Sequence, residues 1–235
     1  MKPNKTKQIL KNGGSAIGTM VSEFTSPELG RLLAAAGFDF IIIDNENSTH
    51  SFESDSAIIR SAADWGLTPL VRVTDTEYHL IARTLDAGAQ GLMVPRVETR
   101  PQVERIVNSV KYPPVGRRGW GVRPVHTDYE AVTVPETIAH LNAHSLVIIQ
   151  IETKLALDNL DDLLSVPGVD VALIGPNDLS ISLGVPGELR HKKMVAGGDA
   201  VVAACQRHGV AAGIHVGNTE DLLFWHSRGM RALMC

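Results

Sequence analysis

Several polar side chains that are able to do chemistry stand at the ends of short apolar runs. Arg72 ends one such run, and Gln150 and Glu152 end another that is rich in Val, Ile and Leu. Asp178 follows the next apolar run, and His215 ends a later one. Carboxylates, a guanidinium and an imidazole are the groups from which metal, anion and proton-transfer sites are built.

The carboxylates of Glu152 and Asp178 are the candidate metal ligands. If they end neighbouring strands, they offer hard oxygen donors to Mg²⁺ or Mn²⁺, while water or substrate fills the remaining octahedral positions. Each residue also has an ordinary structural interpretation. Glu152 could cap the helix that follows it, and Asp178 lies in a turn-like sequence with Gly175 and Asn177.

Arg72 is the candidate anion-binding residue. It lies in the apolar run Pro69-Leu70-Val71-Arg72-Val73, where burial of a guanidinium without a partner is costly. A carboxylate or the oxyanion of an enolate would supply that partner, because both fit the planar fork of donors. The alternative partner is Asp44 or Glu46, in a salt bridge across the protein.

The apolar runs alternate with longer stretches whose apolar residues return every three or four positions, which is typical of β-α units around a parallel sheet. The sequence predicts eight strands, at residues 16–21, 38–44, 68–73, 90–94, 145–152, 170–174, 211–215 and 231–235. It predicts seven helices, at residues 27–36, 53–65, 76–87, 100–110, 155–164, 192–208 and 219–227. These units predict a (β/α)8 barrel that lacks its final helix, with a doubly wound open sheet as the alternative.

In such a barrel the reacting groups stand at the carboxyl ends of the strands, an end that we call the mouth. We therefore expect the polar residues named above to converge there. The one long connection, residues 111–144, contains YPPVGRRGWGVRP, and loops of this length usually carry function. Its Arg117, Arg118 and Arg123 are candidates for an anion-binding rim.

Length and composition limit the classes of protein. A chain of 235 residues that is 44% hydrophobic and 20% charged excludes intrinsic disorder and predicts one folded domain over residues 1–235. A net charge of −4 makes nucleic acid and anionic membranes poor partners. With only two cysteines and no long apolar segment, the sequence predicts a cytoplasmic protein that neither enters nor crosses a membrane.

Seven segments, in order and spacing, resemble one family from about residue 18 to the end of the chain. They are residues 36–46 (AGFDFIIIDNE), 69–72 (PLVR), 85–91 (LDAGAQG), 94–99 (VPRVET), 112–119 (YPPVGRRG), 150–154 (QIETK) and 175–180 (GPNDLS). The family is that of the HpcH/HpaI aldolases, metal-dependent class II enzymes that make or break 4-hydroxy-2-oxo acids through a pyruvate enolate. The resemblance therefore implies an aldolase that acts on a 2-oxo acid and an aldehyde.

The resemblance also implies roles for individual residues. It places the metal, Mg²⁺, Mn²⁺ or Co²⁺, on Glu152 and Asp178 and the pyruvate-binding guanidinium on Arg72. It places Asp86 as the carboxylate that orients a catalytic histidine. The residues that it places beside the oxo acid are Gln150, Gly175 and Pro176. It further implies a homo-oligomer, a hexamer or a trimer.

The sequence departs from the family at the catalytic histidine. The family pattern Asp-x-Glu-His reads Asp44-Asn45-Glu46-Asn47 here, and an amide cannot take a proton at neutral pH. His50 is the candidate replacement, provided that its loop places it near Asp86.

Three alternatives to aldol chemistry therefore stay open. The first is oxaloacetate decarboxylation at the same metal site, which needs no base to begin. The second is a variant that binds metal and a 2-oxo acid without efficient turnover. The third is an activity like that of the citrate lyase β-subunit, which ranks last because the sequence has no clear acyl-CoA signature.

Overall fold

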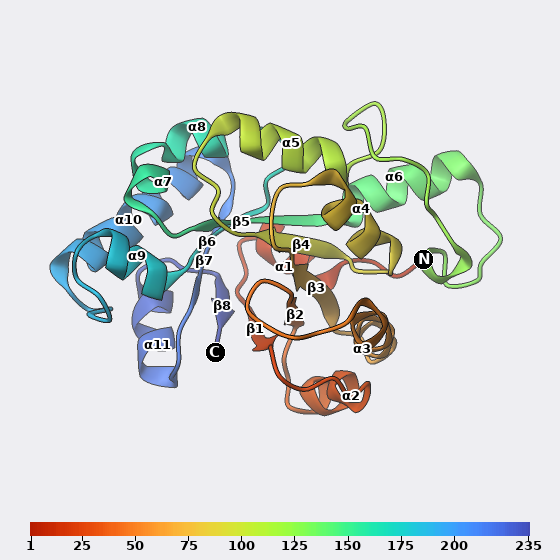
Figure 1. Cartoon of the computed structure of the whole chain (residues 1–235), viewed down its shortest axis with the longest axis horizontal. Coiled ribbons are helices and arrows are strands. Elements are labelled where there is room, and N and C mark those ends of the chain that lie inside the picture. Colours follow the sequence, from red (N-terminus) through yellow and green to blue (C-terminus); the bar gives the residue numbers. More distant parts are fainter.

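The computed structural model describes all 235 residues, and its eight strands close into a parallel barrel in chain order (Figure 1). The strands are β1 (Ala16–Val21), β2 (Phe40–Asp44), β3 (Thr68–Arg72), β4 (Gly91–Val94), β5 (Leu146–Ile151), β6 (Val171–Ile174), β7 (Ala211–His215) and β8 (Ala232–Met234). The ring is closed by parallel pairing of β1 with β8. The predicted (β/α)8 barrel is confirmed, and the open sheet is excluded.

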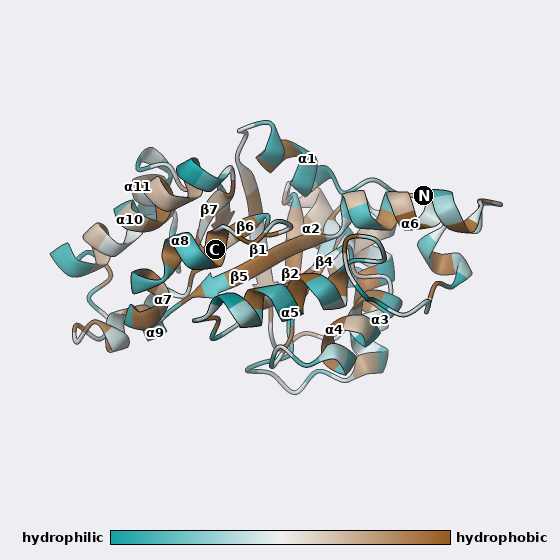
Figure 2. Cartoon of the chain, turned by 90° about the horizontal axis from the view of Figure 1, so that it is seen from above, coloured by the Kyte–Doolittle hydropathy of each residue, from teal (hydrophilic) through white to brown (hydrophobic).

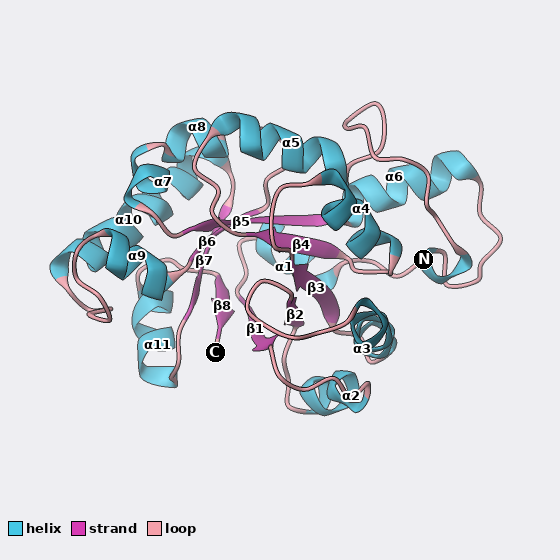
Figure 3. Cartoon of the chain, in the orientation of Figure 1, coloured by secondary structure: helices cyan, strands magenta, loops and turns pink.

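Helices surround the strands on the outside of the barrel (Figure 3). Those that connect consecutive strands are α2 (Glu28–Ala35), α3 (Phe52–Asp64), α4 (Tyr78–Asp86), α5 (Arg100–Val110), α7 (Lys154–Asp158), α8 (Leu160–Leu164), α10 (Lys192–His208) and α11 (Thr219–Ser227). The same connections also contain α6 (Val134–His144), α9 (Pro176–Ser182) and η1 (Pro124–His126), a short 3₁₀ turn. One further helix, α1 (Lys5–Lys11), precedes β1. None of the helices combines the length and the apolar character that crossing a membrane requires.

The strands are apolar on both faces because each face is covered. Phe40, Leu70 and Ile148 belong to a cluster inside the barrel, whereas Ile149 and Ile214 belong to the larger cluster between the barrel and its helices. Figure 2 shows β5 as hydrophobic over most of its length, with polar residues on the outer side of α5. Burial on both faces of a parallel strand produces the continuous apolar runs from which the strands were predicted.

The same alternation brings polar side chains into the mouth. Arg72 follows the inward-facing Leu70 by two positions, so it also points into the barrel. The same alternation directs three further side chains into the barrel. They are Asp44 and His215, the last residues of β2 and β7, and Gln150, the last but one residue of β5.

Three helices, α1, α6 and α9, lie in stretches that the sequence analysis left without regular structure. The helix α6 lies within residues 111–144, where Thr133 and Glu136 form a capping box. The spacing Thr-x-x-Glu is a recognisable start signal, but the turn residues that precede it obscured it. The predicted helix 155–164 is divided into α7 and α8 at Asn159.

The connection 111–144 lies at the end of the barrel opposite the mouth. The helix α6 leads directly into the amino end of β5, and the N-terminal segment packs beside it (Figure 1). Asn4 donates hydrogen bonds to the carbonyls of Gln90 and His144, just before β4 and β5. Its backbone N–H donates to Nδ1 of His144, and His140 bonds the carbonyl of Lys2. No residue of this connection lines the mouth cavity of the same chain.

The packing of α2 against α3 gives the first prediction. A Cβ at Gly30 would lie 2.5 Å from the backbone nitrogen of Ala62 and from Oγ of Ser61. Helix propensity alone favours Gly30→Ala by about 1 kcal/mol, but overpacking costs about 1–3 kcal/mol. We expect a net loss in the free energy of unfolding, measured by urea titration. Gly217→Ala, which has nothing within 4 Å, is the control; a Gly30→Ala protein as stable as this control would contradict the prediction.

Candidate active site

A buried ion pair forms the floor of the mouth. Nε and Nη2 of Arg72 donate to the two carboxylate oxygens of Asp44 at 2.8 and 2.7 Å. Nη1 of Arg72 lies 3.0 Å from Glu46. Arg72 is 8% exposed and Asp44 only 1%. The salt-bridge alternative for Arg72 is therefore the observed arrangement, and it leaves one side of the guanidinium facing the cavity described below.

The pair stays charged because each partner offsets the burial of the other. Burial on its own would raise the pKa of Asp44, but the hydrogen bonds and positive charge of Arg72 outweigh it, so the pKa is lowered. Burial would likewise lower the pKa of Arg72, and the carboxylate of Asp44 raises it instead. The guanidinium is thus a fixed positive charge at the bottom of the mouth.

Glu152 is held in place by two neighbours. Its Oε1 accepts the backbone N–H of Arg96 at 2.6 Å, and its Oε2 accepts Nε2 of Gln150 at 2.5 Å. Arg96 adopts a left-handed φ of 55°, a conformation uncommon for a residue other than glycine. Burial raises the pKa of Glu152 to about 6, and the negative charges of Glu46 and Asp178 contribute to the rise.

Asp178 lies in the first turn of α9, at the carboxyl end of the next strand, β6. Its carboxylate has no hydrogen-bond or ion-pair partner in the chain and lines the cavity of the mouth. Gly175 leaves room for the side chains of Gln150 and Glu152, because a Cβ there would lie 2.5 Å from Nε2 of Gln150 and 2.8 Å from Oε2 of Glu152. Gly175 and Pro176 both line the same cavity.

The cavity of the mouth measures about 330 Å³, within the range of small-molecule sites. One part of its wall is apolar and consists of Met20, Met93, Leu173, Leu189 and Val216. The polar part includes Asn47, Arg72, Gln150, Asp178 and His215. Side chains from seven different strands or the loops that follow them thus converge on one small space.

The donor set fits a divalent cation with hard oxygen ligands. Four carboxylates, Asp44, Glu46, Glu152 and Asp178, share the mouth with two guanidiniums, Arg72 and Arg96, so negative charge is in excess. The buried Oε1 of Gln150 also has no partner. No group of three or more His, Cys, Asp or Glu residues forms a preformed metal cluster. Mg²⁺ and Mn²⁺ match this set, because Mg²⁺ in particular is usually bound by one or two carboxylates while waters or substrate complete the shell.

The structure separates the residues that were expected to handle protons. Asn47 lines the cavity. His50 does not, because its side chain is 1% exposed and its Nδ1 lies 3.1 Å from Asp55. Asp55 also accepts a hydrogen bond from Asn45. His50 is therefore part of a buried polar group with Asp55 and Asn45. It does not lie near Asp86, as the role of replacement base required.

Asp86 is at the far end of the barrel. It is the last residue of α4, which runs away from the mouth for nine residues, about 12 Å at 1.5 Å per residue. Its carboxylate accepts Nη2 of Arg118 at 2.6 Å. Arg118 is 4% exposed, so it does not belong to an exposed rim.

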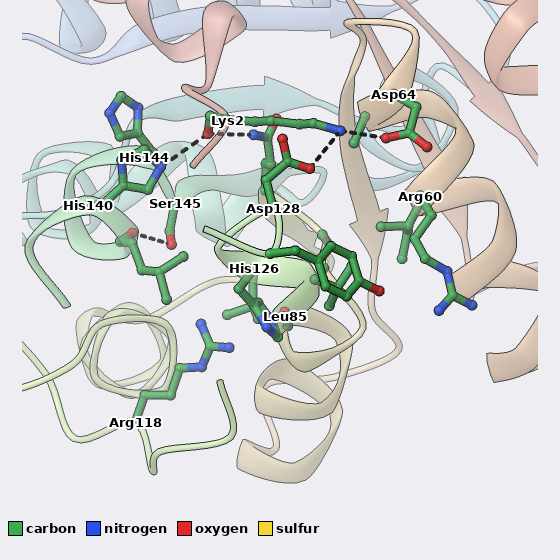
Figure 4. Close-up of a pocket in the computed structure, with 18 residues that line it drawn as sticks. Lys2, Arg60, Asp64, Leu85, Arg118, His126, Asp128, His140, His144 and Ser145 are labelled. Atoms are coloured by element: carbon green, nitrogen blue, oxygen red, sulfur yellow. Dashed lines mark hydrogen bonds and ion pairs between the residues drawn. The ribbon is translucent and has the colours of Figure 1, made fainter. Parts of the chain in front are cut away.

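A second cavity, of about 240 Å³, is lined in part by Arg118. Figure 4 shows Arg118 and His126 on one side of it and Lys2 between Asp64 and Asp128 on the other.

The comparisons with known proteins agree with this geometry. The chain matches the family described as HpcH/HpaI aldolase/citrate lyase over residues 20–223. A 2-keto-3-deoxy-L-rhamnonate aldolase of Escherichia coli is 32% identical over 210 residues, which cover 89% of this chain and 78% of that protein. The crystal structure of an HpcH/HpaI aldolase from Desulfitobacterium hafniense is similar with a TM-score of 0.93 at 32% identity, over 97% of this chain and 88% of that one. The crystal structure of citrate synthase SbnG has a TM-score of 0.85 at 30% identity, over 97% and 89% of the two chains.

The ion pair gives a prediction for stability. Arg72→Met leaves Asp44 buried without a cation, and breaking a buried pair costs about 3–5 kcal/mol. We expect the free energy of unfolding at pH 7 to fall by that amount in a urea titration. The double variant Arg72→Met with Asp44→Leu should regain much of the loss. Arg105→Ala, which removes the exposed pair with Glu77, should cost at most about 1 kcal/mol; equal losses in Arg72→Met and Arg105→Ala would contradict the account.

The raised pKa of Glu152 gives a prediction with a definite sign. The folded protein binds the proton on Glu152, with its pKa of about 6, more tightly than the unfolded chain, so ionisation destabilises the fold as pH rises through 6. Glu152→Gln should therefore stabilise the metal-free protein at pH 7.5 by about 2 kcal/mol, and the gain should vanish near pH 4. Urea titrations with a chelator at both pH values measure it, with the exposed Glu188→Gln as control. A Glu152→Gln protein that is less stable than the parent at pH 7.5 would show that the ionised carboxylate of Glu152 does not destabilise the fold.

Proposed function

The chain belongs to the HpcH/HpaI aldolase/citrate lyase family, and on that premise we propose that it is a divalent-metal-dependent aldolase. As such it is a carbon–carbon lyase that cleaves or forms 4-hydroxy-2-oxo acids. The observation that carries the proposal is the placement of Arg72 and Asp178 on one cavity, with Glu152 bonded to the cavity residue Gln150. An anion-binding group and a cation-binding group thus share a space the size of a small substrate.

Glu152 and Asp178 are the residues that would hold the cation, Mg²⁺, Mn²⁺ or Co²⁺. When bound there, the cation supplies Lewis-acid polarisation of the keto oxygen of the oxo acid. The chain's own residues do not suffice to bind the oxo acid without a cation. The oxo acid is itself an anion, and the excess negative charge of the mouth would repel it. The amide of Gln150 orients Glu152 and offers its unpartnered Oε1 to a water or a substrate hydroxyl.

Arg72 binds and orients the oxo acid. Its position is fixed from behind by Asp44 and Glu46, and the face that lines the cavity donates to the oxygen on which negative charge develops. A donor held in place before the reaction stabilises that charge without reorganisation during it. The apolar wall of the cavity leaves room for the carbon chain of the aldehyde half.

The substrate class follows from the chemistry and from the relatives. The relative from Escherichia coli is named for a 2-keto-3-deoxy acid, which carries a hydroxyl on its fourth carbon. We extend to this chain the class of 4-hydroxy-2-oxo acids, with pyruvate as one product and an aldehyde as the other.

Oxaloacetate decarboxylation is the second candidate, and Asn47 is the observation that favours it. Asn47 lines the cavity at the position where the family pattern has a histidine, and its amide accepts no proton. Loss of CO₂ leaves an enolate without removal of a proton, so this reaction needs only the cation site and Arg72. The third possibility, a protein that binds metal and oxo acid without turnover, would show binding but neither reaction.

We further propose a homo-oligomer, a hexamer or a trimer, in a reducing, cytoplasmic setting. The exposed apolar side chains of Trp120, Tyr129 and Val134 near the 111–144 connection support association. Asp86, at the far end of its own barrel, reaches a mouth only if that mouth belongs to a second copy. Cys205 and Cys235 are both free, which supports a reducing compartment.

Exchange of the methyl protons of pyruvate for deuterium tests the proposal without knowledge of the aldehyde. We expect Mg²⁺ or Mn²⁺ to accelerate the exchange in D₂O, followed by proton NMR. Glu152→Gln and Asp178→Asn should each reduce the metal-dependent rate at least about 100-fold, the scale of a lost Lewis acid. Both variants should also lose metal binding by calorimetry, whereas the exposed Asp162→Asn should behave as the parent. Unchanged metal affinity in both site variants would remove the metal from these two residues.

A further inference from the structure

His215 stands across the mouth from Arg72. It is the last residue of β7 and lines the same cavity as Arg72 and Asn47. Because β3 and β7 are four strands apart in a closed barrel of eight, the guanidinium and the imidazole approach the cavity from opposite walls. A substrate held by Arg72 therefore lies between them.

The imidazole of His215 is free to take a ligand. Neither of its ring nitrogens makes a hydrogen bond within the chain; the neighbours that influence it are the charges of Arg72 and Asp44. Other histidines are already engaged, His50 with Asp55 and His126 with the carbonyl of Leu85. An unpartnered imidazole on a cavity wall is available for proton transfer.

The surroundings of His215 favour the neutral form of its imidazole. Burial lowers its pKa, the nearby Arg72 lowers it further, and the more weakly acting Asp44 raises it. The remaining charged group on the cavity wall is Asp178. A neutral imidazole has a lone pair with which to accept a proton.

The other polar groups of the mouth do not have this capacity. Asn47 is an amide, and the carboxylate of Glu46 is paired with Arg72 and Arg96. Asp178 is a candidate metal ligand, and His50 is buried outside the cavity. His215 is thus the cavity-lining group that can accept a proton and has no hydrogen-bond partner or other assignment.

We propose that His215 is the catalytic base of the lyase reaction, in place of the histidine that the family pattern has at residue 47. The inference deepens the proposed function and rests on it. During cleavage, a ring nitrogen of His215 takes the proton of the C4 hydroxyl, and the O–H electron pair becomes the second bond of the aldehyde C=O. The C3–C4 bond breaks, and its electron pair forms the C2–C3 double bond of the enolate, with the negative charge on the C2 oxygen. The imidazolium then returns its proton to C3, which yields pyruvate and restores the neutral imidazole.

His215→Gln tests this role, because glutamine keeps a polar side chain of similar size that cannot accept the proton. The probe for cleavage is 4-hydroxy-2-oxopentanoate, the adduct of pyruvate and acetaldehyde, with Mn²⁺. We expect kcat for cleavage to fall at least about 100-fold, the scale of general-base catalysis. Oxaloacetate decarboxylation, which needs no base to begin, should fall by about threefold at most. His79→Gln, on the exposed surface of α4, is the matched control and should leave both rates as in the parent.

Rescue by added imidazole separates a base from a structural residue. His215→Ala leaves a space on the cavity wall, and free imidazole should raise its cleavage rate at least about tenfold. Thermal melting of both His215 variants checks that they remain folded. Equal loss of cleavage and decarboxylation with no rescue, or cleavage at the parent rate in His215→Gln, would overturn the role of His215 while leaving the proposed function in place. A parent protein that neither cleaves the probe nor decarboxylates oxaloacetate would overturn both.

Discussion

The ion pair between Arg72 and Asp44 is the constraint on which the mouth of this barrel depends. A guanidinium at an inward position of β3 is largely removed from solvent, so the carboxylate at the end of the neighbouring β2 must balance it. Both side chains are nearly fully buried, and their geometry is bidentate, which fixes the plane of the guanidinium. With Asp44 behind it and Glu46 beside it, Arg72 presents one face to the cavity and has little freedom to rotate. The guanidinium proposed to bind the substrate is thus positioned by the fold itself.

Pairing of Arg72 from behind has an electrostatic consequence for the rest of the mouth. Asp44 and Glu46 neutralise the guanidiniums, and the carboxylates of Glu152 and Asp178 remain without a cation. Burial raises the pKa of Glu152, and the neighbouring carboxylates contribute to the rise. The backbone at Arg96, in a left-handed conformation, supplies an N–H to Glu152 and holds the carboxylate in place. Retention of an unfavourable charge at a fixed position is typical of a functional site. A divalent cation would relieve it and would also admit an anionic substrate.

Much of this arrangement could be predicted from the sequence, because it depends on strand ends. The barrel followed from apolar runs that are buried on both faces, and Arg72, Gln150 and Glu152 followed from their positions at the ends of those runs. Other features depend on the direction of helices or on side chains distant in sequence. Asp86 ends α4 and therefore lies away from the mouth. The side chain of His50 is turned into the protein because its Nδ1 is hydrogen-bonded to Asp55, five residues later. The freedom of the His215 imidazole is likewise visible only once its neighbours in space are known.

The central claim is that Arg72, Glu152 and Asp178 form one site for an oxo acid and a divalent cation. Its most direct test is a crystal structure with Mn²⁺ and oxalate, a mimic of the pyruvate enolate, analysed for the anomalous scattering of manganese. We expect one strong anomalous peak within ligand distance of both Glu152 and Asp178, with an oxygen of oxalate within hydrogen-bond distance of Arg72 and the Arg72–Asp44 pair intact. Oxalate and manganese bound elsewhere, or a guanidinium that leaves Asp44 in order to reach the ligand, would contradict it.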